Sequence, residues 1–247
     1  MSALTPDILI QLGPVPITNT LLNTFLVDTL VIGGALTLKN NLKKIPGLFQ
    51  NMFELIVDSL YNLTESVAGE NTAKIFPYFI SFFLFILIAN WSGLLPGGES
   101  LGFFHHTGEE TEIVSLNRNL TSDLNATLAL ALISLVATHM LSIKKLGVKE
   151  YLSRFFSLNP ILLFVGILEI ISEFTKIISL SFRLFGNIFA GEVVLGTISK
   201  LFAFVFPVPF MFLEIVVGLV QALVFSMLTM AFMSVLMTSH KQEAHAK

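Results

Sequence analysis

Long hydrophobic runs, interrupted at a few points by polar or helix-breaking residues, make up most of this chain. Runs close to or above about 20 residues are long enough to cross a bilayer as helices. The predicted spans are residues 20–38, 75–95, 123–143, 161–200 and 209–239. Three prolines keep residues 1–19 out of a regular helix, so we expect an outer lead there. Residues 96–122 are expected to form an outer loop.

Residues 47–68 show a different pattern, in which apolar side chains recur at helical spacing opposite a polar face. The apolar positions include Phe49, Met52, Phe53 and Ile56, and the opposite positions include Glu54, Asp58 and Glu65. This pattern predicts an amphipathic helix that lies in the membrane interface and does not cross it. Two interpretations of its acidic face remain: it docks on a partner subunit, or it is only solvated.

The composition agrees with a membrane protein, since 54% of the 247 residues are hydrophobic and 13% are charged. We therefore predict an all-α integral membrane protein, with five transmembrane helices and one interfacial helix. The net charge of −3 and the absence of a basic patch exclude a nucleic-acid binder. There is no cysteine, and the adjacent His105 and His106 are weak evidence for a metal site, so we expect neither a metal nor a cofactor.

Basic residues are distributed unevenly between the loops, which predicts the orientation of the chain. Ten lie on one predicted side: Lys39, Lys43, Lys44, Lys74, Lys144, Lys145, Lys149, Arg154, Lys241 and Lys247. Only Arg118 and Lys200 lie on the other. The positive-inside rule then places the N-terminus outside and the C-terminus in the cytoplasm.

The span at 161–200 is unusual in its length and its charges. A helix of about 40 residues measures about 60 Å, twice the thickness of the bilayer core, so it must tilt or kink. With residues 209–239 it is expected to form a long tilted hairpin. At about 100° per residue its polar side chains fall on one narrow face. They are Glu169, Glu173, Lys176, Arg183 and Asn187. Arg183 carries a permanent charge that costs about 2.5–3.5 kcal/mol at the centre of a membrane, which indicates a functional role.

Further polar residues interrupt the other apolar runs. Glu192 lies on a different face of the same helix, whereas Glu214 and Gln221, seven residues apart, share a face of the last span. Asp123 and Asn125 begin the span at 123–143, where Asp123 is also suited to cap the helix. Two more polar residues are interpreted as structural. Asp28 is predicted to be a tolerated carboxyl, and His139, about 24 Å along its helix from Asp123, an interfacial histidine.

Several short motifs together resemble one family. They are Arg183-Leu-Phe-Gly-Asn187, Ala190-Gly191-Glu192, Gln221-Ala222, Asn90-Trp91-Ser92-Gly93-Leu94-Leu95-Pro96 and Asp123-Leu124-Asn125-Ala126-Thr127. They are similar to subunit a of F-type ATP synthases, the membrane stator that faces the rotating c-ring. The chain resembles bacterial or plastid members, because Glu192 and Glu214 stand where some other members have histidine.

The resemblance implies a stator proton-channel subunit with no chemistry of its own, in which two half-channels pass protons to and from carboxylates of the c-ring. Arg183 would separate the half-channels. The outer one would involve Asp123, Asn125, Asn187, Glu192, Glu214 and Gln221, and the inner one Glu169, Glu173 and Lys176. Implied partners are the c-ring, peripheral-stalk (subunit b) helices and the lipid bilayer of the cell (inner) membrane.

Alternatives to this interpretation remain at the level of the sequence. One alternative function is the same subunit coupled to sodium. Another is a transporter or proton channel that acts alone. For the inner residues, a set of ion pairs along one helix is equally compatible with the spacing. Arg183 could instead form a structural salt bridge with Glu214, and Asn187 and Gln221 could simply join two helices.

Overall fold

A computed structural model describes residues 8–12, 15–94, 102–107, 110–115, 118–155, 160–201 and 206–238 of the chain. Its helices are α1 (Asn19–Asn41), α2 (Leu48–Ala68), α3 (Thr72–Ser92), α4 (Leu124–Leu146), α5 (Val148–Phe155), α6 (Pro160–Leu201) and α7 (Pro207–Met237). Its strands are β1 (Ile8–Leu12), β2 (Val15–Thr18), β3 (Gly102–Thr107) and β4 (Glu110–Ser115). Four residues to which the sequence assigned a span end or a cytoplasmic position lie outside the described residues. They are Leu95, Ser239, Lys241 and Lys247.

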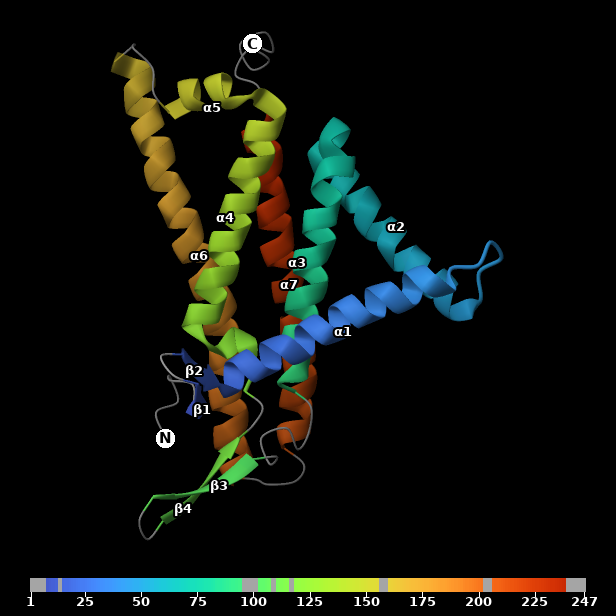
Figure 1. The fold of residues 1–247 in the computed structure, drawn as a ribbon, viewed down its shortest axis with the longest axis vertical. Helices are drawn as coiled ribbons and strands as arrows, with labels where there is room; N and C mark the ends of the chain where they lie inside the picture. The colour runs from blue at the N-terminus through green and yellow to red at the C-terminus, as the bar shows by residue number, and fades with distance from the viewer. Residues whose placement is uncertain are drawn as a thin grey trace.

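Helices α3, α4, α6 and α7 form the centre of the molecule (Figure 1). Their shared core contains fully buried apolar side chains, among them Phe79, Ile86, Leu184, Phe225 and Met233. Hydroxyl groups on different helices of this set also form hydrogen bonds with one another. This core holds α6 and α7, the two helices that carry most of the candidate residues, in one register.

Four helical segments are long and apolar enough to cross a membrane, judged by length and composition alone. They are Asn19–Asn41, Leu48–Ser92, Leu124–Leu146 and Pro207–Met237. The segment Leu48–Ser92 contains both α2 and α3, joined by the short turn Gly69–Asn71. Helix α6 is not among the four, so the fifth span stays a prediction.

Helices α1 and α2 extend away from the centre. Figure 1 shows α1 crossing the direction of α3 and α7 at a wide angle, with its later turns away from the central helices and next to the start of α2. Along α2 the apolar side chains of Phe49 and Met52 are 81% and 57% exposed, as is most of the first half of the helix. The chain itself therefore leaves the apolar face of α2 uncovered.

Two short hairpins and one short helix depart from the sequence-based picture. Strands β1 and β2 pair antiparallel inside the predicted lead, and β3 and β4 pair inside the predicted outer loop. Alternating β-branched and polar residues such as those from Thr111 to Ser115 favour strands, a signal that the all-α prediction did not weigh. The helix α5 follows Gly147, whose φ of 83° ends α4.

Helix α6 is continuous for 42 residues, about 63 Å at 1.5 Å per residue. Figure 1 shows its first turns separated from α4, with α5 lying across the gap, and its second half close to α7. The helices α6 and α7 thus follow one another as a long hairpin. Early in α6, Glu173 lies beside α4 and Glu169 pairs with α5, whereas later in α6 the amide of Asn187 contacts α7.

Candidate functional site

Glu214 of α7 is a buried carboxyl group, with 6% of the residue exposed. It borders a cavity of about 410 Å³ between α6 and α7, together with Asn187, Ala190 and Gly191. Its Oε2 atom has no hydrogen-bond partner. A Cβ atom at Gly191 would lie 2.7 Å from the Glu214 Cδ atom, so a larger residue there would displace this carboxyl group. The glycine of the Ala190-Gly191-Glu192 motif therefore has a steric role.

At the edge of this cavity, an amide pair joins the two long helices. Asn187 Nδ2 donates a hydrogen bond of 2.7 Å to Gln221 Oε1. Gln221 is buried, with 4% exposed, and its Nε2 atom has no partner. The interpretation that these residues join two helices is confirmed, and the unpaired amide nitrogen leaves a hydrogen-bond donor inside the protein.

Arg183 lies on the outer surface of α6 and does not face the core. Its Nη2 atom donates a hydrogen bond of 3.3 Å to Ser179 Oγ, one turn earlier. In the described part of the chain it forms no ion pair. The alternative of a salt bridge between Arg183 and Glu214 is therefore wrong. A permanent charge is costly inside a membrane, and in the described part of the chain the Ser179 hydroxyl is the partner that Arg183 has.

Asp123 and Asn125 lie at the first turn of α4, and the structure does not bring them to Glu214. Asp123 Oδ1 accepts a hydrogen bond of 2.9 Å from the Asn125 backbone nitrogen, so Asp123 caps the helix as expected. Asp123 borders a different cavity, between α1, α3 and α4, and the Asn125 side chain is exposed. Glu192 lies partly buried on α6, one residue after Gly191.

Earlier in α6 a second polar cluster faces α4. Lys176 Nζ donates a hydrogen bond of 2.7 Å to Glu173 Oε1, and it also lies 4.6 Å from the centre of the Phe232 ring of α7. The predicted ion pair along α6 is thus present. Glu173 Oε2 has no hydrogen-bond partner and lies 3.7 Å from His139 Nε2 of α4. A cavity of about 10 Å³, near the smallest size that holds one water molecule, borders Glu173 and Ser134.

The short helix α5 extends this cluster towards the end of the molecule. Tyr151 Oη and His139 Nδ1 are 2.8 Å apart, and Arg154 Nε pairs with Glu169 Oε1 at 2.6 Å. Burial raises the pKa of the Tyr151 hydroxyl, and the Glu173 carboxylate adds to the effect. Tyr151 is therefore protonated at neutral pH, and its hydroxyl shares a hydrogen bond with His139 in which the imidazole tautomer decides the donor.

The interpretation of His139 as an interfacial histidine stays a prediction, and the structure adds that this residue lies between Tyr151 and Glu173. Distances along one helix could not reveal these contacts, which come from α5 and α6. Tyr151 was not predicted at all. The only signal for it was its position twelve residues after His139, in a loop that reads as cytoplasmic.

Asn90 and Trp91 explain part of the motif at the end of α3. Asn90 Nδ2 donates to the Gly218 carbonyl at 2.9 Å, and Trp91 Nε1 donates to the Ile215 carbonyl at 3.1 Å. Both bonds hold the turn of α7 that follows Glu214 against α3. Sequence reasoning assigned no role to Asn90. In the described ranges no group of three or more histidine, cysteine or acidic side chains is arranged to hold a metal ion.

Apolar helices of membrane-spanning length, with ionisable and amide groups collected between them, define a multi-pass membrane protein. The family model described as "ATP synthase A chain" matches residues 21–234. The chain is also 30% identical over 240 residues to "ATP synthase subunit a" of Moorella thermoacetica (strain ATCC 39073 / JCM 9320), covering 97% of this chain and 100% of that protein. The chain therefore belongs to the ATP synthase A chain family, which confirms the resemblance found in its motifs.

Proposed function

We propose that this chain is the stator of a rotary ATP synthase and passes protons to and from a ring of rotor subunits through two half-channels. The observation that supports this most strongly is the position of Arg183. It lies on the outer surface of α6 without an acidic partner in the described part of the chain. A carboxylate on a rotor would supply that partner and would be held ionised by it.

The two polar groups of α6 lie on either side of Arg183 along the helix axis. Glu173 precedes Arg183 by ten residues, about 15 Å, and Gly191 follows it by eight, about 12 Å. Residues that contact Glu173 would line the inner half-channel. Residues around Glu214 would line the outer half-channel. A fixed positive charge between them would oppose the direct passage of protons from one group to the other, so that transport requires rotation.

The outer half-channel comprises Asn187, Glu192, Glu214 and Gln221 around the cavity between α6 and α7. Asp123 and Asn125 would begin this path at the first turn of α4, which a contact of 3.2 Å between Thr127 Oγ1 and Ser181 Oγ joins to α6. Ser181 was not a candidate from the sequence.

The inner half-channel comprises Glu169, Glu173 and Lys176, together with His139 and Tyr151. The phenol, imidazole and carboxyl groups of Tyr151, His139 and Glu173 follow one another across α5, α4 and α6. All three can exchange protons, and imidazole does so near neutral pH. This sequence of groups favours protons over sodium as the transported ion.

The proposed setting is the cell membrane, with the N-terminus outside and the C-terminus in the cytoplasm, as the distribution of basic residues favours. The rotor ring would cover the outer surface of α6, and peripheral-stalk (subunit b) helices would cover other exposed apolar surfaces. The apolar face of α2, which the chain leaves exposed, is available for such contacts or for lipid.

The test is proton flux in vesicles that hold the complete complex. Arg183→Ala and Arg183→Lys should abolish ATP-driven pumping, while passive flux persists or rises once the catalytic head is removed. Lys200→Ala is the matched control, because Lys200 is an exposed cation on the same helix. If pumping survives either Arg183 substitution, the stator function is refuted. If the flux depends on the sodium gradient and not on the pH gradient, the proposal that protons are transported is wrong, whereas the proposed stator function is unaffected.

A further inference from the structure

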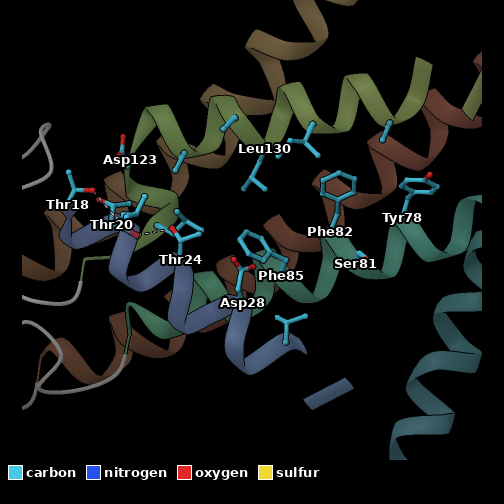
Figure 2. A pocket seen from close by; sticks show the side chains of 17 residues that line it. Thr18, Thr20, Thr24, Asp28, Tyr78, Ser81, Phe82, Phe85, Asp123 and Leu130 are labelled. Carbon is cyan, nitrogen blue, oxygen red and sulfur yellow. Dashed lines mark hydrogen bonds between the residues drawn. The ribbon is translucent and has the colours of Figure 1, made fainter. Parts of the chain in front are cut away.

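A cavity of about 710 Å³ lies between α1, α3 and α4 (Figure 2). Only Asp123, at one end, also belongs to the proposed ion path. The side chains of Phe82, Phe85 and Leu130 make most of its wall apolar, and polar groups are confined to a few positions. Cavities of about 300–1,000 Å³ with mostly apolar walls and a few polar groups are typical of sites for small amphiphilic molecules.

Two polar side chains on the α1 side of this cavity lack partners. Thr20 is 3% exposed, and its Oγ1 atom has no hydrogen-bond partner. Asp28, two turns later, is partly buried and forms no hydrogen bond or ion pair with any residue that the structure describes. A carboxyl group among apolar helices is costly without a partner, and a buried hydroxyl without one is also unfavourable. Both groups line the cavity and require a polar ligand in it.

The charge of the cavity selects the kind of ligand. Asp28 and Asp123 both line it, and no lysine, arginine or histidine does among the described residues. Figure 2 shows the Asp28 carboxyl group beside the Phe85 ring. A carboxylate next to an aromatic face suits an ammonium group, which pairs with the first and interacts with the second. The same two carboxylates repel a ligand with a net negative charge.

The cavity is too small to enclose a transmembrane helix of a partner subunit, so such a helix would have to lie over its open side. A helix of 20 residues is about 30 Å long and 10 Å wide, which corresponds to a volume of about 2,400 Å³. The cavity holds less than a third of that volume. The surrounding bilayer, in contrast, consists of amphiphiles with narrow apolar chains.

We propose that this cavity binds one phosphatidylethanolamine molecule. Its ammonium group pairs with Asp28, and the Thr20 hydroxyl donates a hydrogen bond to an oxygen of the phosphate or glycerol. One acyl chain lies along Phe82 and Leu130. Thr24, one turn from each of the two polar residues, lies between them on the same side of α1. The site has a role separate from ion transport, because it anchors the otherwise weakly packed α1 to α3 and α4 through a lipid.

The test uses the complete complex in nanodiscs that contain trace phosphatidylethanolamine with a photoreactive acyl chain. Cross-linked peptides, located by mass spectrometry, should fall within residues 20–28 and 126–133. Asp28→Asn should lower this labelling about tenfold, as expected for the loss of a charged hydrogen bond. Ala129→Phe, which fills the cavity, should lower it as strongly. Asp58→Asn, at an exposed acidic residue of α2, is the matched control and should leave labelling unchanged.

The choice of lipid is tested by the same label on phosphatidylglycerol, which lacks the ammonium group. Labelling of these two segments by phosphatidylglycerol should be several-fold weaker and insensitive to Asp28→Asn. Equal labelling by the two lipids, or no effect of Asp28→Asn, would overturn the proposal. Absence of labelling in the intact complex would also overturn it, because a partner subunit would then cover the cavity. Co-purification of the other subunits with each variant confirms that the variants assemble.

Discussion

Gly191→Ala is expected to displace the Glu214 carboxyl group and thereby slow proton transport. A methyl group at Gly191 would lie 2.7 Å from Glu214 Cδ, whereas nonbonded carbon atoms approach to about 3.5–4.0 Å. The carboxyl group must therefore move by about 1 Å, and it can do so because it is the flexible end of its side chain. A misplacement of about 1 Å at a reacting group costs up to about 100-fold in rate. We expect ATP-driven proton pumping to fall between about tenfold and 100-fold.

The measurement is the initial rate of acidification of inverted vesicles, normalised to the amount of assembled complex. Gly186→Ala and Gly196→Ala are matched controls on the same helix, because no other side chain or distant backbone atom lies within 4 Å of a Cβ at either position. Both should stay within about twofold of wild type, since alanine is favoured over glycine in a helix by about 0.5–1 kcal/mol.

Glu214→Asp tests the cause of the defect. Its shorter side chain removes the collision, so the double variant Gly191→Ala with Glu214→Asp should pump faster than Gly191→Ala alone. If Gly191→Ala pumps at the wild-type rate, or if Gly196→Ala is equally slow, the steric reasoning is refuted. A double variant no faster than the single one would show that Gly191 acts through something other than Glu214.

Three further predictions follow from the contacts between helices. Asn90→Ala should destabilise the assembled chain by about 1–3 kcal/mol, because it removes the bond that holds α7 to α3; the thermal midpoint of the complex measures this, and an unchanged midpoint contradicts it. A double-mutant cycle of Asn187→Ala and Gln221→Ala should give a coupling energy of about 0.6 kcal/mol in an unfolding assay. A coupling energy of zero would mean that the amide pair does not contribute to stability. His139→Phe should slow passive proton flux through head-depleted vesicles by about tenfold. Tyr151→Phe should slow it less, because the imidazole of His139 remains. Equal flux in the wild type and both variants would show that neither residue belongs to the proton path.

The long helices and their main polar pairings could be predicted from the sequence because they depend on periodicity within one segment. Residues 161–200 were expected as one helix, and α6 covers Pro160–Leu201. The Glu173–Lys176 pair is three residues apart on α6, so its spacing alone predicts it. The role of Asp123 as a helix cap follows from its position before an apolar run.

Contacts that depend on how helices are placed against each other could not be predicted. His139 meets Glu173 and Tyr151 only because α5 turns back after Gly147 and α6 returns beside α4. Asp123 and Glu214 line different cavities, although both read as outer polar residues. Periodicity gives the face of a helix on which a residue lies, but it does not give the neighbour that this face meets.

The exposed position of Arg183 has a consequence for how the complex is made. A newly inserted chain with no rotor beside it holds this charge against lipid, at a cost of about 2.5–3.5 kcal/mol, which corresponds to roughly a 100-fold bias against that state. Under the proposed function, a rotor carboxylate would remove this cost. Arg183 would then also favour assembly of the newly inserted subunit with the rotor.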